Sequence, residues 1–238
     1  MNKVKVITAY VALDVRHLNT ELYHAYGERL RGACDGRLRW FDNFSFDDLW
    51  LVQTHPEILS LPPAAPTPAD RYSSDAGYVR SHCVNNARTQ WALLAAEEDP
   101  EAEVIVWLDL AILKQGDFTG KRVTEDHIRS FLEAVERYDF TNDFPFPGIS
   151  DRRGVVDIHG NNWRFCGSTH IWPVRHLARI DRSYRYCCLE FIRRNACVPL
   201  DLAVWPSVEV RSGLPFRWYP AEYDYTQLSN FPGVTHAP

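Results

Sequence analysis

The apolar run over residues 104–113 restricts the fold more than any other part of the chain, because it carries a single carboxylate, Asp109. An unpaired charge deep in an apolar strand is costly. The strand should therefore end near Asp109, with its ionised carboxylate at the C-terminal edge, held by a metal, a cation or hydrogen-bond donors. Ligands bind at that edge in open α/β sheets. The alternative is an aspartate that caps the next turn of its own backbone.

The first half of the chain alternates strand patterns with amphipathic helix patterns. Strands are expected over residues 4–11, 38–44 and 103–110, and helices over residues 20–30, 78–98 and 124–138. Thr124 is placed to cap the last of these helices. This alternation predicts an α/β fold with a mostly parallel central sheet flanked by helices.

Beyond residue 148 the pattern is less regular. Short strands are expected over residues 154–158 and 162–168 and a helix over residues 177–194, before a tail rich in Trp, Tyr and Pro. The chain shows no internal repeat and no long linker. We therefore expect one domain over residues 1–238, with a less regular C-terminal half.

Composition narrows the class of protein. The 238 residues are 45% hydrophobic, which is ample for a core, and a net charge of -5 argues against a protein that coats nucleic acid or anionic membranes. Six cysteines show no C-x-x-C pair, which predicts reduced thiols. The chain has no signal-peptide pattern and no apolar run near the roughly 20 residues of a membrane span. These features predict a cytoplasmic protein.

Several standard sites are missing from the sequence. It contains no G-x-G-x-x-G, no Walker-type loop, no H-E-x-x-H and no G-x-S-x-G. Dinucleotide oxidoreductases, P-loop NTPases, zinc proteases of that type and α/β-hydrolases are therefore disfavoured.

Residues 107–113, W-L-D-L-A-I-L, resemble a strand of the GT-A glycosyltransferases, in which a D-x-D motif lies beside the nucleotide-diphosphosugar. The version is similar to that of galactosyltransferase-like and uncharacterised bacterial or viral members. The resemblance implies a Rossmann-like GT-A domain, with residues 1–120 as the nucleotide-sugar-binding half and residues 121–238 as the acceptor-side half. The implied activity is transfer of a hexosyl or pentosyl group from a nucleoside-diphosphate sugar to a glycan or other hydroxyl acceptor.

The same resemblance implies a set of donor-binding residues. Thr8 and Tyr10, at the end of the first strand, would contact the base or ribose, and Arg88 would meet the diphosphate. Asp109 would position the donor. Gly167 would let the sugar and acceptor approach the backbone closely. The alternatives are ordinary strand residues and an exposed arginine paired with a nearby acid.

Two further carboxylates are candidates for catalysis. Residues 198–205 resemble the family's D-Q-x-x-x-W segment, with Asp201 as its aspartate and Leu202 in place of the glutamine. Apolar neighbours should raise the pKa of Asp201, as a catalytic base requires. Asp157 is the second candidate base. The competing interpretations are a helix cap for Asp201 and a solvated side chain for Asp157.

The D-x-D resemblance is degenerate, because Ala111 stands where the second aspartate would be. A divalent cation, Mn²⁺ or Mg²⁺, would then be held by Asp109 together with Asp224 of the C-terminal segment, where the family often supplies a histidine. Without a metal, Asp109 would bind sugar or ribose hydroxyls and basic side chains would take the diphosphate.

Two other functions stay open. Arg175, Arg179 and Arg182 recur at helical spacing and would suit DNA phosphates, as in a DNA-modifying glycosyltransferase that acts on a hydroxylated base. The alternative for these arginines is a solvated helix face. Ala111 and Tyr223 instead favour a non-catalytic nucleotide-sugar-like binding module.

Overall fold

A mixed four-stranded sheet forms the centre of the protein. The computed structural model describes residues 1–11, 13, 20–64, 75–115, 120–151 and 164–235. The strands lie in the order β2-β1-β3-β5. Their bounds are β1 Val4–Ala9, β2 Leu38–Phe41, β3 Val104–Leu108 and β5 Thr169–Pro173. β2 and β3 pair with β1 in parallel, and β5 pairs with β3 in antiparallel orientation. The predicted α/β fold with a mostly parallel sheet is confirmed.

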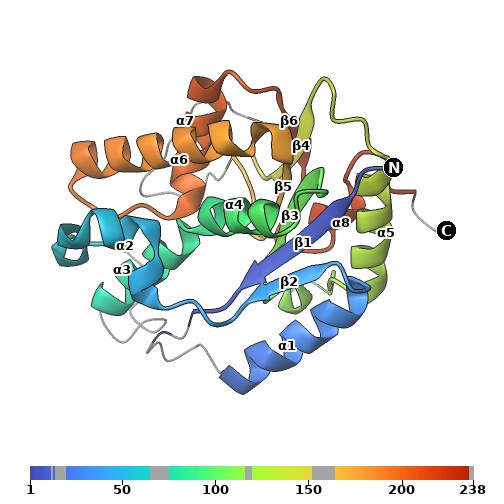
Figure 1. Ribbon diagram of the computed structural model, residues 1–238, viewed down its shortest axis with the longest axis horizontal. Coiled ribbons are helices and arrows are strands. Elements are labelled where there is room, and N and C mark those ends of the chain that lie inside the picture. The colour runs from blue at the N-terminus through green and yellow to red at the C-terminus, as the bar shows by residue number, and fades with distance from the viewer. Residues whose placement is uncertain (12, 14–19, 65–74, 116–119, 152–163, 236–238) are drawn as a thin grey trace.

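Helices cover both faces of this sheet (Figure 1). α1 (Thr20–Ala33) and α5 (Glu125–Arg137) pack together on one face. On the other face α4 (Arg88–Glu98) contacts β1 and β3, and the long helix α6 (Val174–Asn195) packs over α4. A strand covered on both sides needs apolar residues at every position, and all five residues of β3 are buried.

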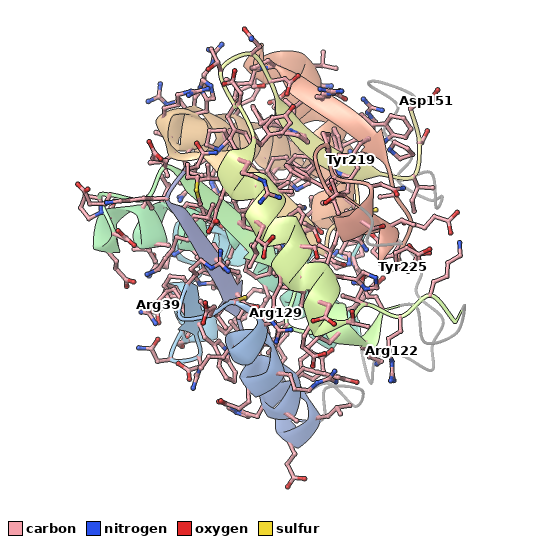
Figure 2. The ribbon with its side chains drawn as sticks, turned by 90° about the vertical axis from the view of Figure 1, so that its right-hand side faces the viewer. Arg39, Arg122, Arg129, Asp151, Tyr219 and Tyr225 are labelled. Atoms are coloured by element: carbon pink, nitrogen blue, oxygen red, sulfur yellow. The ribbon has the colours of Figure 1, made fainter. Side chains whose placement is uncertain are left out.

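The predicted cap of α5 is confirmed. The Thr124 hydroxyl accepts a hydrogen bond from the His127 N–H at 3.3 Å, and the His127 ring accepts one from the Thr124 N–H. The His127 ring also stacks on Tyr225, with ring centroids 5.0 Å apart. Figure 2 shows α5 crossing the side of the molecule that carries Tyr219 and Tyr225. The C-terminal segment is thereby held against this helix.

The helix predicted over residues 78–98 is wrong in one respect, because two helices replace it. α3 (Asp75–Asn85) ends before α4 begins at Arg88. Between them, the Asn86 carbonyl accepts a hydrogen bond from the Trp50 indole at 2.9 Å instead of continuing the helix. Trp50 begins the short helix α2 (Trp50–Thr54). A distant side chain therefore sets this break.

In the second half, sequence reasoning misses one strand, and it expects the helix that begins at Asp201 only as the alternative role of that residue. β4 (Phe144–Gly148) pairs in parallel with β6 (Phe216–Pro220), although F-P-F-P-G does not read as a strand. A two-stranded sheet consists of edges only, and edges tolerate proline. α7 (Asp201–Ser212) contains Pro206, which normally breaks a helix.

The strand predicted over residues 162–168 is also wrong within the described part. Residues 164–168 form bends and irregular backbone, and β5 starts only at Thr169. The strand predicted over residues 154–158 lies outside the described residues. The remaining short elements are η1 (Phe46–Asp48), η2 (Pro56–Ser60), η3 (Ile112–Lys114) and α8 (Thr226–Ser229).

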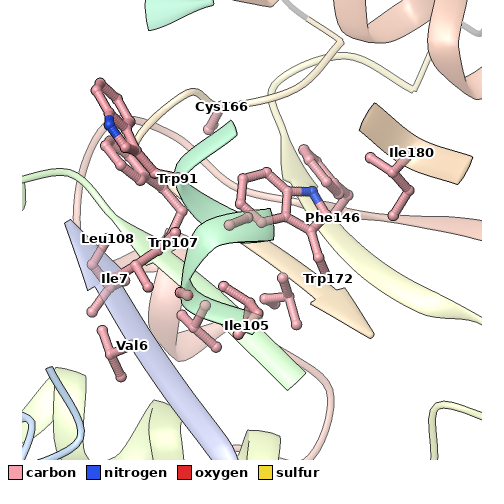
Figure 3. Close-up of a cluster of buried hydrophobic side chains, with 14 of the residues drawn as sticks. Val6, Ile7, Trp91, Ile105, Trp107, Leu108, Phe146, Cys166, Trp172 and Ile180 are labelled. Carbon is pink, nitrogen blue, oxygen red and sulfur yellow. The ribbon is translucent and has the colours of Figure 1, made fainter. Parts of the chain in front are cut away.

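One hydrophobic core runs from the first strand to the C-terminal segment. At its centre the indole rings of Trp91 and Trp107 stack with centroids 5.7 Å apart, and Phe146 and Trp172 (Figure 3) both pack against His170 and Trp205. All six cysteines are free and buried. No helix among the described residues is long and apolar enough to cross a bilayer. The division at residue 120 into donor and acceptor halves stays a prediction.

Gly148 provides a test of packing at the end of β4. A Cβ added there would lie 1.8 Å from the Arg164 carbonyl oxygen and 2.6 Å from the Trp218 indole nitrogen. We expect Gly148→Ala to lower the free energy of unfolding by about 2 kcal/mol or more, because the backbone must shift. Gly32→Ala is the control: its Cβ would meet nothing within 4 Å, and a helical alanine should stabilise by about 0.5–1 kcal/mol. Urea unfolding measures both, and equal effects would contradict the clash.

Candidate functional site

A cavity of about 210 Å³ opens at the C-terminal ends of β1 and β3. The chain leaves β1 for β2 on one side and later returns to β3 on the other, so this is the switch point of the sheet. The lining is mostly apolar and aromatic, with two charged residues. It consists of Ala9, Tyr10, Val11, Leu13, Tyr23, Ser81, Val84, Asn85, Arg88, Trp91, Trp107, Asp109 and Leu110.

Asp109 follows β3 directly and uses its two carboxylate oxygens differently. Oδ1 accepts a hydrogen bond from the Ala111 N–H at 2.8 Å, so the aspartate does cap its own turn. Oδ2 lies 3.8 Å from the Arg88 guanidinium, and the side chain is 31% exposed. Because Asp109 also lines the cavity, one oxygen braces the backbone while the carboxylate stays at the ligand edge.

Arg88 begins α4 and connects several parts of the site. It forms an ion pair with Asp201 through Nη1, and Nη2 donates to Asn85 Oδ1 at 2.7 Å. The guanidinium also lies over the Trp107 ring, 5.2 Å from its centroid. Its Nε is buried and has no hydrogen-bond partner within the described residues. The side chain is therefore held in place with one donor left over.

Asp201 is the first residue of α7, and only 2% of its side chain is exposed. Burial raises the pKa of this carboxyl to about 6, although the positive charge of Arg88 acts in the opposite direction. The direction agrees with the effect expected of its apolar neighbours. The N-terminal end of the helix also favours a negative charge at this position.

Gly167 lies against this ion pair. A Cβ added to it would lie 3.0 Å from Arg88 Nη1, 3.1 Å from Leu202 Cδ2 and 3.5 Å from Asp201 Oδ2. Glycine is therefore needed for close packing around the pair. Its predicted contact with a sugar stays a prediction.

The two predicted residues of the first strand differ in position. Tyr10 lines the cavity, and its ring lies 5.9 Å from that of Tyr23. Thr8 is fully buried inside the strand and is not part of the lining. The structure therefore brings Tyr10 to the site with Arg88 and Asp109, and does not bring Thr8 there.

The second proposed metal ligand has other contacts. Asp224 is buried, its Oδ1 accepts hydrogen bonds from the N–H and hydroxyl of Thr226, and Lys121 Nζ lies 3.7 Å from its Oδ2. It does not line the cavity. No group of three or more His, Cys, Asp or Glu side chains suited to a metal occurs within the described ranges. Asp157 lies outside the described residues, so its role stays a prediction.

Sequence reasoning missed Asn86, a buried residue whose side chain links two segments of the site. Its side-chain amide donates to the carbonyls of His82 and Pro199, each at 2.8 Å, and its Oδ1 accepts from the Tyr184 hydroxyl at 2.6 Å. Asn86 lies two residues before Arg88, and Pro199 lies two residues before Asp201. The amide therefore joins the two segments that carry the ion pair. In the sequence, the only signal is a polar residue within an otherwise helical pattern.

The architecture is that of an α/β protein with the cavity at the switch point of its sheet. A solved structure similar to it is that of a glycosyltransferase involved in the glycosylation of the major capsid of PBCV-1. The match has a TM-score of 0.52 at 10% identity and covers 91% of this chain and 81% of that chain. No protein-family model matches the sequence, and no curated protein matches it either. At this identity the likeness establishes the fold, and assignment to GT-A stays a prediction.

The raised pKa of Asp201 predicts a pH-dependent stability. Between the ordinary value of 3.8 and the folded value of about 6, the folded state binds more protons at this carboxyl than the unfolded state does. The stabilisation relative to Asp201→Asn should therefore fall as the pH rises through this window. Urea unfolding at several pH values measures the difference.

Asp139→Asn is the control, because its effect on stability should change with pH in the opposite direction. Hydrogen bonds from Thr141 lower the pKa of Asp139, so its contribution to stability should be lost as the pH falls through the folded pKa. A wild-type advantage over Asp201→Asn that does not change with pH would contradict the assignment for Asp201.

Proposed function

We propose that this chain is a glycosyltransferase that moves a sugar from a nucleoside-diphosphate sugar to an acceptor hydroxyl. The observation that carries the proposal is the cavity between β1 and β3, where Arg88 stands between Asp109 and Asp201. The likeness to a solved glycosyltransferase fold supports it. So does the resemblance of residues 107–113 to a D-x-D strand.

The cavity wall suits the nucleoside end of such a donor. Tyr10, Tyr23 and Trp107 provide aromatic surface on which a base can pack. Arg88 would then meet the diphosphate, because it lines the cavity and its buried Nε has no acceptor among the residues that the structure describes. A planar guanidinium with several donors is well suited to phosphate oxygens.

The charges at the site favour a divalent cation in the donor complex. Arg88 already faces the two carboxylates of Asp109 and Asp201, so these three residues provide no surplus positive charge for a diphosphate. Enzymes commonly hold Mg²⁺ through one or two carboxylates together with substrate phosphates and water. Asp109 alone fits this pattern, and Asp224 would not be required. A bound Mg²⁺ or Mn²⁺ would offset the charge that develops on the departing nucleoside diphosphate.

Asp201 is proposed as the carboxylate that acts near the anomeric carbon. It lies beside Gly167, where the sugar and acceptor are expected to approach the backbone. A carboxylate with a pKa of about 6 is largely ionised at neutral pH, yet it binds a proton more readily than an ordinary aspartate does. Such a group can receive the proton of an attacking hydroxyl. In the free protein it also orients Arg88.

Asp109→Asn tests the central assignment. The amide oxygen can still accept from the Ala111 N–H, so folding should be retained, while the charge at the ligand edge is lost. We expect donor hydrolysis and sugar transfer to fall about 100-fold or more, measured as nucleoside diphosphate released from a panel of nucleotide sugars with Mg²⁺ or Mn²⁺. Asp139→Asn is the matched control, since that carboxylate also caps an N–H two residues ahead.

The outcomes separate the functions. Unchanged turnover in Asp109→Asn would remove Asp109 from the mechanism. If the wild-type protein binds nucleotide sugars in calorimetry but releases no nucleoside diphosphate, the chain is a binding module instead. If no donor binds at all, the proposal is wrong.

Arg88→Lys tests the diphosphate contact while keeping the positive charge. A lysine cannot reproduce the fork that reaches both Asp201 and Asn85. We expect the Kd for uridine or guanosine diphosphate to rise about tenfold in calorimetry. Arg39→Lys is the matched control. Arg39 forms a bidentate ion pair with Glu98 outside the cavity lining, so its substitution should leave this Kd unchanged. Equal affinities of the Arg88→Lys variant and the wild type would contradict the role of Arg88.

A further inference from the structure

The acidic residues of α6 and α7 are all paired with particular arginines. On α6, Asp181 binds Arg185, and Glu190 binds Arg193 and Arg194. On α7, Asp201 binds Arg88 and Glu209 binds Arg164. The two helices contain no other acids. Their remaining arginines therefore have no acidic partner on either helix.

These remaining arginines gather with exposed apolar side chains. Arg179 and Arg182 are exposed on α6, three residues apart, and Arg211 is exposed near the end of α7. None of them forms an ion pair within the described part of the chain. The Arg211 guanidinium lies over the Tyr186 ring, 5.0 Å from its centroid. Tyr186 is 50% exposed and Val210 is 62% exposed. We call Arg179, Arg182, Tyr186, Val210 and Arg211 the α6–α7 basic face.

Arg175 adds to the positive potential beside this face, and His176 does not. Arg175, one turn before Arg179, is also exposed, and its guanidinium donates to the Phe140 carbonyl. The pKa of His176 is lowered by partial burial and by the charges of Arg175 and Arg179. His176 therefore adds no charge to this face at neutral pH. Arg175 is also near an acid, because its charge contributes, after the hydrogen bonds from Thr141, to the lowered pKa of Asp139.

We propose that the α6–α7 basic face docks on an anionic lipid bilayer. The arginines would contact lipid phosphates, while the tyrosine ring and the valine would enter the headgroup layer, where such side chains gain from partial burial. The exposed valine decides between lipid and nucleic acid, because an aliphatic side chain gains little from a phosphate backbone. Because the chain as a whole carries a net charge of -5, only this face would be attracted to the bilayer, and the contact would fix the orientation of the protein on it. The proposal does not depend on the transferase activity.

Vesicle co-sedimentation of the full chain tests this proposal. The wild-type protein should bind vesicles of phosphatidylcholine mixed with phosphatidylglycerol and should not bind phosphatidylcholine alone. Each arginine near an anionic surface contributes about 1 kcal/mol, so Arg179→Ala with Arg182→Ala should weaken partitioning roughly 30-fold. Val210→Ser should weaken it further at a salt concentration that screens the charges.

The matched control lies on the same helix. Arg193→Ala with Arg194→Ala removes the same charge from residues paired with Glu190, and it should change partitioning less than about threefold. An equal loss in both double variants would overturn the proposal, because net charge alone would explain it. Tighter binding to duplex DNA than to anionic vesicles would overturn it in favour of nucleic acid. So would equal partitioning into both kinds of vesicle.

Discussion

The ion pair between Arg88 and Asp201 is the interaction on which the site depends. Both side chains are almost fully buried, so either one alone would be a charge without compensation. The pair persists because the surrounding chain fixes both partners. Asn86 ties the segment before α4 to the segment before α7, and Gly167 leaves room beside the guanidinium. The result is a cavity lined by the charged side chains of Arg88 and Asp109, at the edge of the sheet where two parallel strands end.

A second polar network supports the same helix from the other side. The Thr89 hydroxyl donates to Asp181 at 2.8 Å, and the other oxygen of Asp181 accepts from Arg185 at 2.8 Å. The Arg185 guanidinium in turn lies over the Trp50 ring, 4.9 Å from its centroid. α4 is thus anchored on α6 through residues adjacent to Arg88. A buried network of this kind is specific only when every member is satisfied, which favours one arrangement of the two helices.

Much of the fold could be predicted from the sequence, because strand and helix periodicity in the first half is local. Residues close together in the sequence are enough to predict the strands around Val6 and Val106 and the cap at Thr124. The elements that were predicted wrongly or missed depend on contacts between residues far apart in the sequence. The break at Asn86 depends on a tryptophan 36 positions away, and the strand of Phe144 exists because a distant segment pairs with it. Periodicity contains no information about such partners.

The candidate site shows the same division. An apolar run interrupted by Asp109 was enough to predict a carboxylate at the ligand edge. A resemblance to a family placed Arg88 and Asp201 near it, and they are in contact. Asp201 itself is buried and does not line the cavity, and the same holds for Thr8 and Asp224, which the resemblance also named. Position along a strand does not determine which side chains reach its open end.

The antiparallel direction of β5 has a consequence for how such a site can diversify. Because β5 runs opposite to β3, it enters the sheet at the ligand edge, and the Ser168 carbonyl accepts from the Asp109 N–H at 2.8 Å. The segment that precedes β5 is also fixed to β4, because the Cys166 N–H donates to the Pro147 carbonyl at 2.8 Å, and to α7, through the ion pair of Arg164 with Glu209. None of residues 164–173 lines the cavity, so this segment acts on it through the residues that it contacts: Gly167 packs against Arg88, and Ser168 holds the backbone of Asp109. Substitutions just before β5 can therefore shift Arg88 and Asp109 while every residue of the cavity lining stays the same.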